Sequence, residues 1–449
     1  MRILTFSALI FLYIISNFTT SVYLYYSIGT FALLALVISF KHTRGLYRIS
    51  GITFLFVATL LFIYNGLPWY TFLLYFDTML GVLSLFLVLP FINSIIRVGL
   101  YDKNLSLLLQ QGISDLSKLY RRSFLVCHFL GLFLNIATIP LLTNSLKTTL
   151  SQIPKNVAEK FYTQNLLRAY ALCLVWSPLE IMVITSLDIT NNEYYKLFPI
   201  IISIVLIIIL SDWILSSFKH KSLQIEVDFK TEILYKSVYK KILQMVSMLV
   251  ILVLIVTIFQ HLANQGFLLS VVIMLIPVSL LWAFLIKKIK RYFLYTIPHW
   301  KERTKGLPNY FFMFLSAGLF VEMLSLSELL SFLQDTFSVL SEKTLLFYLT
   351  IGAFFLFTSF IGFHPLVSLT LITELLNPVL AEVSSISLTI VLITCSLSTV
   401  LYSPYNLSVS ILAEQLKLNP YKLGMWNLLF AIYFMLVSIF IAYFITLIF

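Results

Sequence analysis

Long, almost uncharged apolar runs alternate along this chain with short basic segments. A helix that crosses about 30 Å of hydrocarbon needs about 20 apolar residues. Several runs are long enough for one or two such helices: 3–40, 51–76, 242–259, 267–286 and 424–449. The runs are continuous rather than alternately apolar and polar, which excludes a β-barrel pore. The pattern predicts an all-α polytopic membrane protein with about ten transmembrane helices.

Two of the apolar runs are interrupted by the same short motif. LVWSPLE occupies 174–180 and VLYSPYN occupies 400–406. A shift of 226 residues superimposes the two without a gap and also superimposes Tyr195-Lys196-Leu197 on Tyr421-Lys422-Leu423. A second matching triplet at the same shift predicts an internal duplication.

Composition and charge agree with a membrane protein. Hydrophobic residues make up 60% of the chain and charged residues only 11%, whereas a soluble domain has about a quarter charged residues. In a membrane protein, the net charge of +11 first indicates which segments face the cytoplasm, because basic residues tend to stay on that side. With the N-terminus and six segments placed there, 28 of the 30 Lys and Arg residues are cytoplasmic; the segments are 41–48, 97–122, 146–168, 217–241, 287–308 and 416–422.

This topology requires two segments that enter the membrane and return on the same side. Basic residues flank 123–145 on both sides, so we expect a re-entrant hairpin that turns within 135–140. The region 344–376 lacks basic flanks and is expected to dip in from the outside, turning within 360–365. Each half then reads as a hairpin, a broken helix and a closing helix, in opposite orientations. That is an inverted-topology repeat.

The predicted domain boundaries follow from this interpretation. An N-terminal helical pair covers 1–49, and a cytoplasmic linker covers 217–241. Repeat 1 covers 50–216, with hairpin 123–160 and broken helix 166–187, and repeat 2 covers 242–449, with hairpin 344–380 and broken helix 384–415. The N-terminus is expected in the cytoplasm and the C-terminus outside. The abundance of Ile, Phe, Lys and Asn favours the cytoplasmic (inner) membrane of a bacterium.

A proline in a helix interior removes one hydrogen bond and costs about 3 kcal/mol. Open backbone at membrane depth is tolerated only beside protein or a water-filled cavity. Ser177-Pro178 and Ser403-Pro404 are therefore expected to expose carbonyls and half-helix N-termini to a central site for an ion or an anionic group. The alternative is that each proline only kinks its helix for packing.

The layout of hairpin, broken helix and inverted copy resembles the ion transporter superfamily, which includes divalent-anion/sodium symporters, the large subunit of tripartite periplasmic (TRAP) transporters and arsenite-permease-like proteins. The Ser-Asn-Thr signature of the anion/sodium branch is absent. The nearest pieces are Thr143-Asn144-Ser145 and Ser359 with His364. The resemblance implies a transport domain that moves against a scaffold domain, like an elevator, and a homodimer.

The candidate site residues are polar groups at the hairpin turns and helix breaks. Those predicted to bind substrate or ion are Asn135, Thr138, Thr143, Asn144, Ser177, Glu180, Ser359, His364, Ser403 and Asn406. Asp77 and Glu322, in the spans before the hairpins, are candidate coupling carboxylates, since ionisable groups inside spans are costly and usually functional. For Glu180, Asp77 and Glu322 a structural role is the alternative, and His364 equally suits an exposed turn. His128 is expected to satisfy a backbone carbonyl, and Asp212 with Trp213 to anchor the chain at the interface.

These observations favour a secondary transporter, a symporter that moves a small anionic solute and uses sodium or a proton as coupling ion. The alternatives are a flippase or another handler of a lipid-linked substrate, and a non-transporting membrane partner. The sequence lacks GxxxxGK[ST], HExxH and GxSxG motifs, so we expect no enzyme activity, no metal site and no cofactor. The three cysteines are read as buried small apolar residues. The basic segments 97–122 and 287–308 are expected to lie on anionic lipid rather than on nucleic acid.

Overall fold

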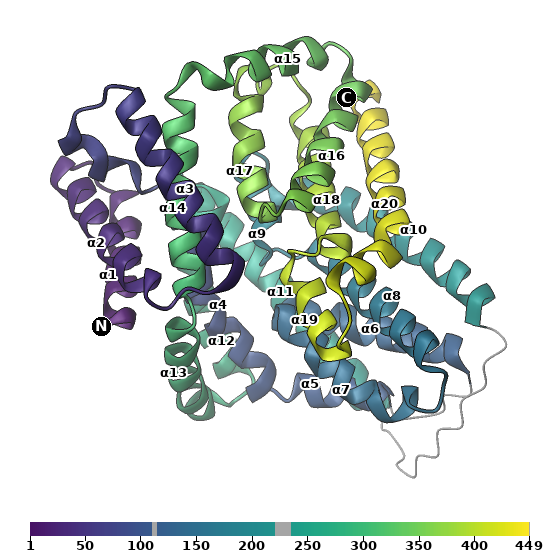
Figure 1. The fold of residues 1–449 in the computed structure, drawn as a ribbon. Coiled ribbons are helices and arrows are strands. Elements are labelled where there is room, and N and C mark those ends of the chain that lie inside the picture. The colour runs from purple at the N-terminus through teal and green to yellow at the C-terminus, as the bar shows by residue number, and fades with distance from the viewer. Residues whose placement is uncertain (110–114, 221–234, 449) are drawn as a thin grey trace. The chain divides into compact units, whose positions relative to one another are not determined.

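The computed structural model describes residues 1–109, 115–220 and 235–448. These residues form α-helices and short 3-10 turns, with no strand among them (Figure 1). Within this part of the chain, ten helical stretches are long and apolar enough to cross a membrane, and two of them, Leu116–Leu150 and Ser385–Leu416, each combine two helices. The prediction of an all-α polytopic membrane protein is therefore confirmed. Most of the linker 217–241 and part of the segment 97–122 lie outside the described residues.

The chain divides into two compact units that do not follow the predicted repeat boundaries. Unit 1 comprises Met1–Val98, Leu254–Val339 and Thr370–Val379, and unit 2 comprises Gly99–Val253, Leu340–Leu369 and Leu380–Phe449. Three helices cross from one unit to the other in sequence: α11 (Tyr235–Ala263), α15 (Ser331–Ser341) and α17 (Pro365–Leu376). The repeat boundaries stay a prediction.

Unit 1 is built on the close pairing of α3 with α14. Its elements are α1 (Arg2–Ser16), α2 (Val22–Phe40), α3 (Gly45–Tyr64), η1 (Trp69–Tyr75), α4 (Leu80–Val98), α12 (Phe267–Leu285), α13 (Ile289–Lys305), α14 (Pro308–Ser325), η4 (Glu328–Leu330) and η5 (Asn377–Val379). A Cβ on Gly51 would lie 2.5 Å from the Phe312 ring, so the absence of a side chain there lets α3 and α14 approach. The Phe54 and Phe320 rings stack at 5.3 Å further along the same pair.

Unit 2 holds both Ser-Pro motifs. Its elements are α5 (Tyr101–Ser106), η2 (Leu107–Leu109), α6 (Leu116–Leu134), η3 (Asn135–Ala137), α7 (Thr138–Leu150), α8 (Lys155–Leu174), α9 (Ile181–Ile189), α10 (Tyr194–His220), α16 (Thr344–Ile361), α18 (Ser385–Tyr402), α19 (Leu407–Leu416) and α20 (Pro420–Ile448). It holds the first helical hairpin, α16 and the turn of the second hairpin, two interrupted helices and two long closing helices, α10 and α20.

The first hairpin consists of α6, η3 and α7. Ser123 Oγ donates to Asn165 Oδ1 at 2.8 Å near the start of α6, and a Cβ on Gly131 would lie 2.5 Å from Cys173 Sγ near its end. Residue numbers thus rise together along α6 and α8, which means that the two helices run in the same direction. The intervening α7 must therefore run back. The chain reverses at η3, where Asn135 has a φ of 50°.

The second hairpin consists of α16 and α17 and repeats this arrangement. Across its turn, Ser368 Oγ donates to Thr358 Oγ1 at 2.9 Å. The helix α16 runs parallel to α18, because a Cβ on Gly352 would lie 3.7 Å from Cys395 while Ser359 contacts Tyr402 seven residues further along each helix. Gly362 ends α16 with a φ of 109°, a conformation that L side chains rarely adopt.

Candidate functional site

The first interrupted helix of unit 2 is α8 followed by α9. Helix α8 ends at Leu174 and α9 begins at Ile181. Between them, the Glu180 amide donates to the Ser177 carbonyl at 3.1 Å and closes a turn around the proline. Glu180 itself is the N-cap of α9, and only 8% of its surface is exposed. It forms no ion pair within the described part of the chain.

The second interrupted helix, α18 followed by α19, carries the same turn. The Asn406 amide donates to the Ser403 carbonyl at 3.0 Å, and Asn406 is the N-cap of α19. Its Oδ1 accepts a hydrogen bond from the backbone amide of Ser408 at 3.1 Å. Glu180 and Asn406 therefore occupy matching positions. One supplies a carboxylate and the other an amide.

The physical reason for both turns is local. Proline cannot donate to the carbonyl one turn earlier and its ring clashes with it, so the helix opens at this point. Proline also has the φ that the second residue of a β-turn requires. The freed groups are partly satisfied by hydroxyls, because Ser410 Oγ donates to the Pro404 carbonyl at 3.0 Å and Ser408 Oγ donates to the Val400 carbonyl at 2.8 Å. At the first break, the Leu179 amide donates to Ser177 Oγ at 3.3 Å. Short polar side chains thus satisfy part of the open backbone at both breaks.

The two interrupted helices run in opposite directions beside each other. Helix α9 packs against α18, and α8 packs against α19. The hydroxyls of Thr190 and Thr389 are hydrogen-bonded at 2.6 Å, and Asn192 Nδ2 donates to Thr389 Oγ1 at 2.7 Å. Ser177 lies 13 residues before Thr190, and Ser403 lies 14 residues after Thr389. The two Ser-Pro turns consequently lie at nearly the same level of unit 2.

Each hairpin is hydrogen-bonded to the break that follows it. In the second half, Ser403 Oγ donates to the Ser359 carbonyl at 2.9 Å, and Ser359 Oγ donates to Tyr402 Oη at 3.1 Å. In the first half, Trp176 Nε1 donates to His128 Nε2 at 2.9 Å. The aromatic residue before each Ser-Pro thus contacts the first helix of its own hairpin. His128 bonds to this indole.

The other candidates on the hairpins have different surroundings. Asn135 Oδ1 accepts from the Tyr170 hydroxyl and from the Ile136 amide, which fixes the first turn. Thr138 is fully buried, and its hydroxyl has no hydrogen-bond partner among residues that the structure describes. Thr143 donates to the carbonyl of Ile139 in its own helix.

Two further candidates are less enclosed. Asn144 is exposed on α7. His364 is half-buried in the second turn, where its Nδ1 accepts from the Leu366 amide at 3.2 Å. These contacts do not connect Asn144 or His364 to either Ser-Pro turn.

Asp77 and Glu322 lie in unit 1, whereas the residues of the two breaks lie in unit 2. Both carboxylates are half-buried, and Thr78 Oγ1 donates to Glu322 Oε2 at 3.1 Å. Their role in coupling stays a prediction. In the described residues there is no group of three or more His, Cys, Asp or Glu side chains able to hold a metal ion.

Sequence reasoning missed a buried ion pair in unit 2. Arg168 Nη1 lies 2.6 Å from Asp212 Oδ1, with the two side chains 13% and 1% exposed. Tyr120 donates to Asp212 Oδ2 at 2.9 Å, Arg168 Nε donates to Asn427 Oδ1 at 2.9 Å, and the guanidinium lies 4.2 Å from the Phe430 ring centre. Asp212 is thus part of a buried network, and its role in anchoring the chain at the interface stays a prediction. The only sequence signal was a lone arginine next to an apolar run.

No family model and no curated protein matches the chain. Among solved structures, the crystal structure of the YdaH transporter of Alcanivorax borkumensis, described as having an unusual topology, is similar to it. The TM-score is 0.58 with 12% sequence identity, over 88% of this chain and 98% of that chain. This likeness shows a shared fold. Membership of the ion transporter superfamily, the homodimer and the inner-membrane location stay predictions.

Proposed function

We propose that the protein is a secondary transporter that moves a small anionic solute across a membrane, coupled to a sodium or proton gradient. The observation that carries the proposal is the pair of matched Ser-Pro turns in unit 2, which interrupt two antiparallel helices at nearly the same level. The similar solved structure is that of a transporter, which supports the proposal.

Each turn presents the N-terminus of a short helix, where backbone amides and the helix dipole favour negative charge. At α19 the cap is the neutral Asn406, whose Oδ1 is engaged by Ser408. Its Nδ2 makes no hydrogen bond to another described residue, so it can donate to a bound anion. We assign this turn, with Ser403, to the anionic group of the solute.

At α9 the cap is Glu180, whose carboxylate already supplies the negative charge that the helix N-terminus favours. A buried carboxylate without a cationic partner must take up a proton or a cation to remain buried at low cost. We assign Glu180, together with the open backbone around Ser177, to the coupling ion. The matched turns therefore have complementary roles, one for a cation and one for an anion.

Both hairpins reach the two turns through hydrogen bonds within unit 2. In this proposal the hairpins are re-entrant, the two halves are inverted repeats, and unit 2 moves as the transport domain against unit 1 as scaffold. Alternating access of this kind exposes one fixed site to either side in turn.

The test is uptake of labelled organic acids, oxyanions and amino acids into proteoliposomes, with a sodium gradient, a proton gradient or neither. Gradient-dependent accumulation of at least one anion is expected. Glu180→Gln should abolish the dependence on the gradient while leaving solute exchange at equal ion concentrations, because the amide cannot take up a proton. The matched control is Glu414→Gln, an exposed carboxylate on α19, which should transport like the unmodified protein.

Two outcomes would contradict the proposal. Absence of gradient-dependent flux for all three solute classes, in protein that remains monodisperse, would remove the transporter assignment. Transfer of a fluorescent lipid between leaflets, without any solute flux, would instead favour a flippase. If Glu180→Gln accumulates solute normally, transport stands but Glu180 is not the coupling group.

A further inference from the structure

A basic helix of unit 1, α13, lies in sequence between α12 and α14. Only Ile286, Lys287 and Lys288 separate it from α12, and only Gly306 and Leu307 separate it from α14. Helix α12 is apolar enough to span a membrane, and α14 passes the same test together with α13, at an angle of 55° to it. These short connections keep α13 close to the end of α12 and to the start of α14, and the bend of 55° means that α13 does not continue the direction of α14.

One face of α13 is fixed to α4. Tyr292 and Thr296 are each 1% exposed. The Tyr292 hydroxyl donates to the Phe91 carbonyl at 3.2 Å, and Trp300 Nε1 donates to the Leu87 carbonyl at 3.0 Å. These bonds set which side of the helix faces away from unit 1.

The remaining surface of α13 combines apolar and basic side chains. Phe293, Leu294 and Ile297, in the middle of the helix, are 45%, 69% and 43% exposed. The segment 287–305 has a single acidic residue, Glu302. Its basic residues lie at both ends of the helix: Lys287, Lys288, Lys290, Arg291, Lys301, Arg303 and Lys305. None of them forms an ion pair with a residue that the structure describes.

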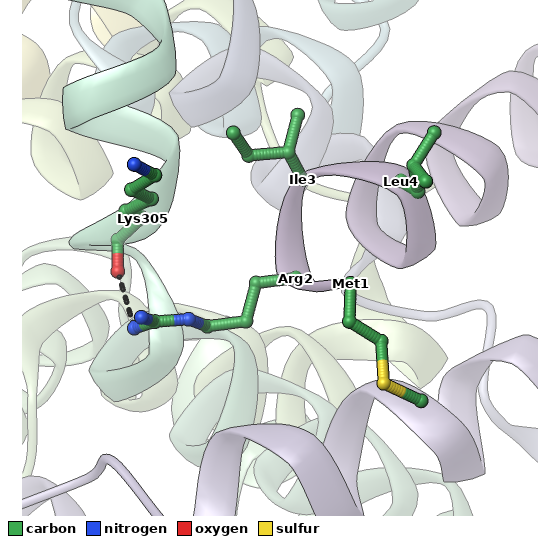
Figure 2. Close-up of a pocket in the computed structure, with 5 residues that line it drawn as sticks. All are labelled: Met1, Arg2, Ile3, Leu4 and Lys305. Atoms are coloured by element: carbon green, nitrogen blue, oxygen red, sulfur yellow. Dashed lines mark hydrogen bonds between the residues drawn. The ribbon is translucent and has the colours of Figure 1, made fainter.

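The N-terminus of the chain adds to the same end of α13. Arg2 Nη1 donates to the carbonyl of Lys305, the last residue of the helix, at 3.1 Å (Figure 2). Met1, Arg2, Ile3, Leu4 and Lys305 line a pocket of about 380 Å³. The Met1 and Leu4 side chains are 89% and 76% exposed. The pocket thus pairs two cationic side chains with apolar ones.

We propose that α13, with the first turn of α1, is a binding surface for the anionic lipids of the bilayer leaflet that it faces. The exposed apolar residues enter the boundary between headgroups and acyl chains, and the basic residues at both ends contact lipid phosphates. An amphipathic helix with basic residues and Phe or Leu on its free surface binds in this way. A positively charged surface without acidic partners is complementary to an anionic leaflet.

Lipid binding by α13 does not depend on transport, and a fluorescent label on α13 can report it directly. Leu294→Cys gives a single reactive thiol, because the three native cysteines are buried. The thiol is labelled with an environment-sensitive fluorophore in phosphatidylcholine nanodiscs that contain a trace of doxyl-labelled phosphatidylglycerol or doxyl-labelled phosphatidylcholine. Each Lys or Arg near an anionic leaflet raises association by a factor of about five. We expect quenching by the phosphatidylglycerol probe to exceed that by the phosphatidylcholine probe severalfold, and little quenching by aqueous iodide.

Charge removal tests whether the preference for anionic lipid depends on the basic residues of α13 or on basic residues elsewhere in the chain. In the Leu294→Cys background, neutralising four exposed residues of α13 should strongly reduce the excess quenching by the phosphatidylglycerol probe: Lys290→Gln, Arg291→Gln, Lys301→Gln and Arg303→Gln. A control with the same loss of charge in unit 2 should keep the preference: Lys118→Gln, Lys155→Gln, Lys417→Gln and Lys422→Gln. All eight residues are exposed.

Three results would overturn the proposal. Strong iodide quenching without lipid quenching would place α13 away from the bilayer. Equal quenching by the two lipid probes in the unmodified background would remove the preference for anionic lipid. A preference that survives neutralisation of α13 but not of the unit 2 control would assign it to other basic residues.

Discussion

The buried pair of Arg168 and Asp212 gives the sharpest test of how unit 2 is held together. It joins α8 to α10, and through Asn427 it joins both to α20, so elements of the two matched halves meet in one network. Replacing Asp212 with Ala removes the carboxylate from Arg168 and from Tyr120 together. An arginine that is only 13% exposed then lacks its counter-ion.

The expected cost follows from that burial. Breaking a buried ion pair by removing one partner costs about 3–5 kcal/mol, because an uncompensated charge stays buried. The contacts of Arg168 to Asn427 and to the Phe430 ring remain, so we expect Asp212→Ala to be near the lower end, about 3 kcal/mol. At about 2 °C per kcal/mol for a body of this size, the melting temperature should fall by about 6 °C.

The assay is thermal unfolding in nanodiscs, followed by loss of the monodisperse peak. The double variant Arg168→Met with Asp212→Leu should recover most of the loss, since replacing a buried pair with apolar residues of similar volume is often neutral. The control is Lys155→Ala, which removes one partner of the Lys155–Glu159 pair, whose lysine side chain is 89% exposed. That change should cost about 0–1 kcal/mol.

Equal melting temperatures for Asp212→Ala and Lys155→Ala would refute this reasoning, because the buried pair would then contribute no more than an exposed one. A double variant that is as unstable as Asp212→Ala would show that the cost arises from lost packing rather than from an unpaired charge.

Three further predictions use the same unfolding assay. A Cβ on Gly424 would lie 2.1 Å from the Tyr402 carbonyl oxygen, so Gly424→Ala should cost about 1–3 kcal/mol through overpacking next to the second break; an unchanged melting temperature would contradict this close approach. Ser403→Ala leaves the Ser359 carbonyl without the hydroxyl that donates to it, and should cost about 1–3 kcal/mol; a Ser403→Thr variant that keeps the hydroxyl should lose less. Asn144 is exposed, so Asn144→Ala should stay within about 0.5 kcal/mol, and a larger loss would mean that this side chain has a buried contact.

The fold class and the two helix breaks could be predicted from the sequence because each depends on local properties. A run of about 20 apolar residues is long enough to span a bilayer whatever its neighbours are. A proline removes a hydrogen bond from the helix that contains it, and α8 and α18 end just before Ser177-Pro178 and Ser403-Pro404. Helices α4 and α12 nevertheless continue through Pro90 and Pro277. The positive φ of Gly362 likewise lies within the range expected for the second turn.

What the tertiary structure decided is which distant residues meet. No sequence pattern pairs Arg168 with Asp212, or Thr190 with Thr389, because such partners are set by the packing of helices rather than by the pattern within one helix. The same packing assigned Asp77 to unit 1 and both helix breaks to unit 2. A chain of apolar helices has many ways to bury its surface, since apolar contact is non-directional. Close approach and hydrogen bonding between particular side chains select one of them.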